Sequence, residues 1–92
     1  MGASREPLNE TTARDLAMKA VDAEGGPRNV YRNPRYPFTL NPTTDYIFDG
    51  HEVELRHGEI SSPAIVTVEG WVFEIHDEDI SLLMMPVQRK NQ

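Results

Sequence analysis

The chain has 92 residues, 38% of them hydrophobic, so it is long enough for one domain with a thin core. It contains no cysteine, which excludes a disulfide framework and thiolate chemistry. Its net charge of −6 at pH 7 argues against a general affinity for nucleic acid, because nucleic-acid-binding domains are basic overall.

Residues 1–10 are expected to form a flexible N-terminus. They contain no apolar stretch of the kind found in a signal peptide. No apolar run in the chain approaches the ~18 residues of a membrane span. These features predict a cytoplasmic protein with no membrane partner.

Residues 12–24 predict the one helix of the chain. Thr12 is expected to cap its N-terminus, and Gly25 and Gly26 are expected to end it. So short a helix needs a sheet or a partner to pack against. Its apolar face consists of Ala13, Leu16, Ala17, Ala20 and Val21, which recur at helical spacing.

Residues 27–43 interleave arginine and tyrosine with prolines and predict an irregular or extended arm, with a short edge strand at 36–40. Arginine beside tyrosine is typical of a stacking platform for single-stranded nucleic acid, but the acidic charge of the domain argues against nucleic acid as a partner. The alternative is that the arm docks on the acidic side of the protein's own sheet. The contacts of the arm would come from Arg28, Tyr31, Arg32, Arg35 and Tyr36.

From residue 44 to residue 86 the pattern has the two-residue period of β-strands. Asp49-Gly50 and Glu69-Gly70 each separate two runs of β-forming residues, which predicts two hairpins with two-residue turns. The first turn places Asp45 opposite Glu54. The second turn brings six apolar residues onto one side of its hairpin, and this is the strongest indication of the core in the chain. They are Ala64, Val66, Val68, Trp71, Phe73 and Ile75.

Residues 80–85 predict a last strand that is apolar on both faces. Such a strand is central in its sheet, covered by the helix, or part of an interface between subunits. The interface hypothesis assigns contacts between subunits to Ile80, Leu82, Leu83, Met84 and Met85. Residues 11–86 are then a single domain, and residues 87–92 are a basic tail.

The predicted fold class is therefore α+β and mostly β. It has one short N-terminal helix and an antiparallel sheet of five or six strands. A small, partly closed barrel is the alternative, because closure hides the edges of the sheet.

The acidic residues are concentrated between Asp45 and Asp79, where ten acids stand against one base, Arg56. Such a surface attracts a basic partner, although small domains also carry charge for solubility alone. Like charges directly opposite on a sheet are destabilising, so Asp45 facing Glu54 indicates a compensating cation. The predicted partner-binding residues are Asp45, Glu52, Glu54, Glu74, Asp77, Glu78 and Asp79.

Metal binding and catalysis have weak signals in the sequence. His76 with Asp77 or Asp79 supplies two ligands, but no further ligand stands at metal-site spacing, so we predict no metal or other cofactor. The chain has no nucleophile motif and no phosphate-binding loop. A thin core also leaves little room for a water-poor catalytic pocket, and we expect no enzyme.

Three functional hypotheses follow. The first is a non-enzymatic protein-binding module whose acidic sheet face engages a basic partner. One form of it is a phage-type inhibitor, or DNA mimic, of a nucleic-acid-handling protein. The second is a structural protein that forms homo-oligomers through its apolar last strand, and the third is a small metal-dependent protein that uses His76.

Overall fold

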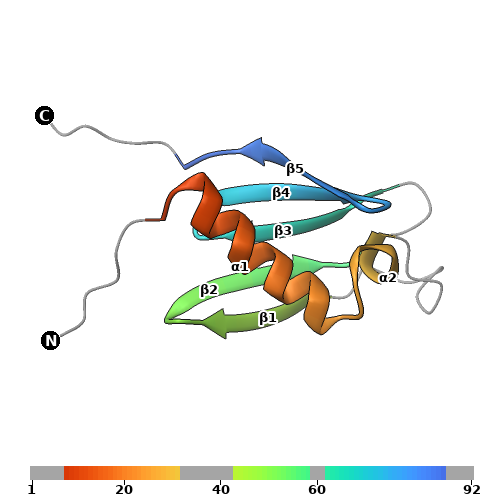
Figure 1. The fold of residues 1–92 in the computed structure, drawn as a ribbon, viewed down its shortest axis with the longest axis horizontal. Coiled ribbons are helices and arrows are strands. Elements are labelled where there is room, and N and C mark those ends of the chain that lie inside the picture. The colour runs from red at the N-terminus through yellow and green to blue at the C-terminus, as the bar shows by residue number, and fades with distance from the viewer. Residues whose placement is uncertain (1–7, 32–42, 59–61, 87–92) are drawn as a thin grey trace, which may run out of the picture.

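The computed structural model describes residues 8–31, 43–58 and 62–86. Its elements are α1 (Glu10–Ala23), α2 (Pro27–Tyr31), β1 (Thr43–Phe48), β2 (His51–Arg56), β3 (Ala64–Val68), β4 (Trp71–His76) and β5 (Asp79–Met84). The five strands form one antiparallel sheet in the order β1-β2-β3-β4-β5, and α1 lies across one face of it (Figure 1). The predicted α+β class is confirmed. The sheet is not closed into a barrel, so β1 and β5 are its edges in the part of the chain that the structure describes.

The helix α1 begins two residues earlier than predicted because Asn9, and not Thr12, caps it. The side chain of Asn9 accepts a hydrogen bond from the backbone N–H of Thr12 at 2.8 Å. Asparagine is at least as good an N-cap as threonine. The end of the helix is as predicted: Gly26 N–H donates to Val21 O at 2.9 Å, and Gly25 has a φ of 105°.

The first residues of the predicted arm form the short helix α2. Proline is favoured at the first position of a helix, and Pro27 occupies that position here. Val30 is fully buried in the core, which fixes the helix to the sheet. The prediction of an irregular or extended arm is therefore wrong for residues 27–31. The strand predicted at 36–40 and the basic tail at 87–92 lie outside the described residues.

Both predicted hairpins are present in the predicted register. Asp45 stands opposite Glu54 in the pairing of β1 with β2, and the pairing of β3 with β4 also agrees with the prediction. Asp49 and Gly50 have φ values of 54° and 82°, as a type I′ turn requires. The hydrophobic pattern and the two turns were sufficient to fix which residues share a face.

The core lies between α1 and the sheet. Every second residue of β2, β3 and β4 is buried, and so are the five residues on the predicted apolar face of the helix. The largest fully buried side chains are Phe73, Leu55 and Ile75. Because these residues point toward α1, the residues between them point to the opposite face of the sheet.

The last strand, β5, is an edge strand and not a central one. Each strand pairs with the next one in the chain, so the last strand of the meander lies at an edge of the sheet. Ile80 and Leu82 are half-buried against the core, whereas Leu83, Met84 and Met85 are 51%, 60% and 57% exposed. A register shift between β4 and β5 interrupts the alternation near these exposed residues. The apolar character of both faces therefore does not indicate a central strand here.

Candidate functional site

The candidate site is the face of the sheet that points away from α1, which we call the uncovered face. None of its side chains is buried. It carries charged, polar and apolar side chains from all five strands, in contrast to the apolar core face. Its residues are Thr43, Asp45, Ile47, Glu52, Glu54, Arg56, Ile65, Thr67, Val72, Glu74, His76, Asp79, Ser81 and Met84.

A hollow of about 550 Å³ lies over β1, β2 and the end of β3. Four carboxylates line it, and among the described residues that line it there is no basic side chain. Three of them, Asp45, Glu52 and Glu54, are predicted partner-binding residues, and the fourth is Glu69 from the β3–β4 turn. Arg56 lies beside a second, smaller hollow of about 230 Å³ that also touches Glu54. We call the larger hollow, with the four carboxylates that line it, the acidic hollow.

Glu69 was not predicted as a site residue, and its side chain joins the two hairpins. Its Oε1 lies 3.0 Å from Nδ1 of His51, and its Oε2 accepts a hydrogen bond from Glu52 N at 3.2 Å. His51 is buried, with 8% of its surface exposed. The turn residue is thus fixed against the start of β2, and its carboxylate lies in the same hollow as the other three.

The remaining predicted partner-binding residues lie on the other side of β3. Glu74 is on β4, where its Oε1 is 2.7 Å from Nε2 of His76. Asp79 pairs with His76 at the start of β5, and Asp77 and Glu78 form the turn between them. The uncovered residues of β3 and the middle of β4 are Ile65, Thr67 and Val72, which carry no charge. The predicted acidic surface is therefore divided into two groups by a neutral strip.

One arginine of the predicted arm contacts the second acidic group. Nε of Arg28 lies 3.7 Å from Oδ1 of Asp77 and 3.7 Å from Oε2 of Glu78. All three side chains are about 70% exposed or more, so these ion pairs are weak. Tyr31 ends α2, and Arg32, Arg35 and Tyr36 lie outside the described residues. The structure places Arg28 by the β4–β5 turn and not at the acidic hollow.

A polar cluster on the face of the sheet that α1 covers was not predicted from the sequence. The carboxylate of Glu24 accepts a hydrogen bond from the hydroxyl of Tyr46, and its Oε1 lies 3.1 Å from Nε2 of His57. Burial, together with the bond to Glu24 and the charge of Glu24, raises the pKa of Tyr46 to about 12. His57 is 4% exposed. The cluster fixes the end of α1 to β1 and to the residue that follows β2.

The described part of the chain does not supply the set of ligands that the metal hypothesis requires. In residues 8–31, 43–58 and 62–86, no three His, Cys, Asp or Glu side chains are grouped so that they could hold a metal ion. His76 is paired with Glu74, which was not one of the two ligands suggested for it.

Comparison of the chain with family models, with curated proteins and with solved structures finds no match. Neither of the described helices is long and apolar enough to cross a membrane.

Proposed function

We propose that this chain is a non-enzymatic protein-binding module that engages a basic surface of its partner through the uncovered face of its sheet. The observation that carries the proposal is the acidic hollow, where four carboxylates line one depression and no basic side chain from the described part of the chain lies among them. An excess of one sign of charge in a depression attracts ligands of the opposite sign and speeds their association.

The arrangement of Asp45 and Glu54 supports this proposal over simple solubility. They stand directly opposite each other in the β1–β2 pairing, where two like charges are destabilising. Charge needed only for solubility can be spread over the surface without this cost. A cationic group of a partner between the two carboxylates would relieve the repulsion.

The partner class that fits is a protein with a basic surface, and a nucleic-acid-handling protein is one such partner. The module would then act as an inhibitor, with its carboxylates in the place of the phosphates of nucleic acid. The chain has no cysteine, so nothing in it requires an oxidising compartment, and we place the interaction in the cytoplasm.

The test is a pull-down of partners from the native host, followed by a salt titration of the captured complex. We expect affinity to fall steeply between about 50 and 500 mM salt, because salt screens exposed charges. The double variant Asp45→Asn, Glu54→Gln should lose the partner, whereas Asp15→Asn, Asp22→Asn, which removes the same charge from α1, should retain it. Binding that is independent of salt and of Asp45 and Glu54 would contradict the proposal.

A second function, homo-oligomerisation through β5, is favoured by a separate observation. Leu83, Met84 and Met85 are 51–60% exposed at an edge of the sheet, where an added strand would cover them. Light scattering at high protein concentration tests it, and a monomer at every concentration would remove it. An oligomer through β5 would leave the acidic hollow free, because β1 is at the other edge.

A further inference from the structure

We propose that the basic partner contributes an extended segment that pairs with β1 as an additional antiparallel strand. This inference rests on the function proposed above and specifies how the partner binds. The uncovered face supplies the charge that selects a basic segment, and the edge of β1 supplies backbone groups that can bind it. Addition of a strand to a sheet edge is a recurrent mode of peptide recognition.

The register of the β1–β2 hairpin determines which backbone groups point outward. Phe48 and His51 flank a two-residue turn and therefore form a hydrogen-bonded pair. Hydrogen-bonded and non-hydrogen-bonded pairs alternate along an antiparallel ladder. The N–H and C=O groups of Ile47 and Asp45 consequently point away from β2, toward the edge of the sheet.

The same two residues have side chains on the uncovered face. Ile47 is 70% exposed, and Asp45 is an exposed member of the acidic hollow. A residue of the added strand that pairs with Asp45 therefore projects its side chain on the uncovered face, beside Asp45 and in line with Glu54. A lysine or arginine at this position would be attracted to both carboxylates and would offset part of their mutual repulsion.

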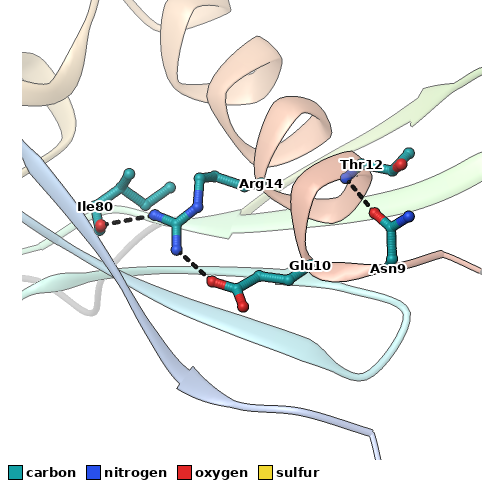
Figure 2. A network of polar contacts seen from close by, with 5 residues as sticks. All are labelled: Asn9, Glu10, Thr12, Arg14 and Ile80. Atoms are coloured by element: carbon teal, nitrogen blue, oxygen red, sulfur yellow. Dashed lines mark hydrogen bonds and ion pairs between the residues drawn. The ribbon is translucent and has the colours of Figure 1, made fainter.

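The other sheet edge is less suited to a basic segment. Nη1 of Arg14 on α1 donates a hydrogen bond to the carbonyl oxygen of Ile80 on β5 at 2.9 Å (Figure 2). Nη2 of Arg14 is held by Glu10 at 2.7 Å, so the guanidinium stays over this edge. Beyond Asp79 at its start, β5 carries no acidic side chain, and Arg14 occupies an outward-facing carbonyl oxygen of this edge. A basic segment therefore favours the β1 edge.

The β1 strand is also held in place before any partner binds. The hydroxyl of Tyr46 is bonded to Glu24, and the ring of Tyr46 stacks on that of Phe48 with 5.3 Å between centroids. Nζ of Lys19 on α1 also lies 5.5 Å from the centroid of the Phe48 ring. A strand fixed in this way is a pre-formed template, which lowers the entropy lost on binding.

The experiment measures binding of synthetic peptides to the full chain at about 50 mM salt, where charge effects are large. The probe is a short, end-capped peptide in which valine and lysine alternate. Two further peptides carry N-methyl groups, one on the lysine amides and the other on the valine amides. If the lysines pair with Asp45 and Ile47, their N–H groups donate to β1, whereas the valine N–H groups point to solvent.

We expect methylation of the lysine amides to weaken binding about tenfold or more, as loss of several backbone hydrogen bonds requires. Methylation of the valine amides should have little effect. Asp45→Asn, Glu54→Gln should weaken the unmethylated peptide by a similar factor, and Asp15→Asn, Asp22→Asn should not. The unmethylated peptide and the two methylated peptides carry the same charge, so the comparison between them isolates the contribution of backbone hydrogen bonds to binding.

Three other results would overturn the inference in different ways. Equal binding of the two methylated peptides, still lost in Asp45→Asn, Glu54→Gln, would exclude strand addition but leave the proposed function intact. Binding that ignores both methylation and the acidic substitutions would exclude both proposals. Binding that appears only after Arg32 and Arg35 are replaced by serine would show that the chain's own arm, and not a partner, uses this edge.

Discussion

Glu69 Oε1 lies 3.0 Å from His51 Nδ1, so the turn of the second hairpin is bonded to the first residue of β2. Glu69 holds a φ of 47°, a conformation that residues with a side chain rarely adopt and that glycine adopts readily. A glutamate at such a position is unfavourable unless its side chain compensates. Its bonds to His51 and to the N–H of Glu52 supply that compensation.

The first prediction compares Glu69→Ala with Glu69→Gly. Both variants lose the two bonds, which should lower the free energy of unfolding by about 1–2 kcal/mol. Alanine also keeps the cost of a positive φ, so Glu69→Ala should be less stable than Glu69→Gly by about 1 kcal/mol. Urea denaturation measures both values. An alanine variant as stable as the parent would show that the side-chain bonds do not hold the turn.

The second prediction concerns Arg14, which connects α1 to β5. Its guanidinium lies 5.4 Å from the centroid of the buried Phe73 ring, in addition to its bonds to Ile80 O and Glu10. Arg14→Met keeps the apolar stem of the side chain and removes these interactions, so it should lower the free energy of unfolding by about 1–2 kcal/mol.

Arg28→Met is the matched control for this substitution. The ion pairs of Arg28 are 3.7 Å long and exposed, and the change should cost less than about 0.5 kcal/mol. Thermal unfolding of both variants, checked by urea denaturation, makes the comparison. Equal losses in the two variants would mean that the contact between Arg14 and β5 contributes nothing.

The third prediction is a dependence of stability on alkaline pH. The pKa of Tyr46 is raised from 10.0 to about 12 in the folded chain, so folding favours the protonated hydroxyl. The stabilisation from this group is complete below pH 10 and is lost as the pH rises from about 10 to about 12. The sign follows because the unfolded chain releases this proton at a lower pH than the folded chain does.

Tyr46→Phe isolates this effect from the other two tyrosines of the chain. The variant should be less stable than the parent near pH 8 by about 1 kcal/mol, because the bond to Glu24 is lost. Above pH 10 the difference between the two proteins should shrink. Urea denaturation at several pH values measures this difference, and a constant difference up to pH 11 would contradict the assigned environment of Tyr46.

The fold was largely predictable because its information is local. Asp49-Gly50 and Glu69-Gly70 are two-residue turns, and each of them fixes the register of its hairpin without help from distant residues. Alternation of apolar and polar residues then sorts the side chains between the core and the uncovered face. Three members of the acidic hollow, Asp45, Glu52 and Glu54, followed from the first hairpin alone.

The remaining features join residues that are far apart in the chain. Arg14 and Ile80 are 66 residues apart, and Glu24 and His57 are 33 apart. No spacing rule connects such pairs, because their approach depends on how α1 lies across the sheet. Glu69 was treated only as a turn residue, although a non-glycine residue before Gly70 was a local signal that its side chain makes a compensating contact.

The last prediction tests whether the proposed function costs stability. Glu54→Gln removes one charge of the Asp45–Glu54 pair and should raise the free energy of unfolding by a few tenths of a kcal/mol at low salt. Glu52→Gln is the control on the same strand and face, since Glu52 stands opposite the uncharged Ile47, and it should gain less. Added salt should reduce the difference between the two variants, because salt screens the repulsion.

If Glu54→Gln gains stability and also loses the captured partner, the repulsion between Asp45 and Glu54 is maintained for binding. If Glu54→Gln is less stable than the parent, the two carboxylates do not repel each other, and the argument against simple solubility fails.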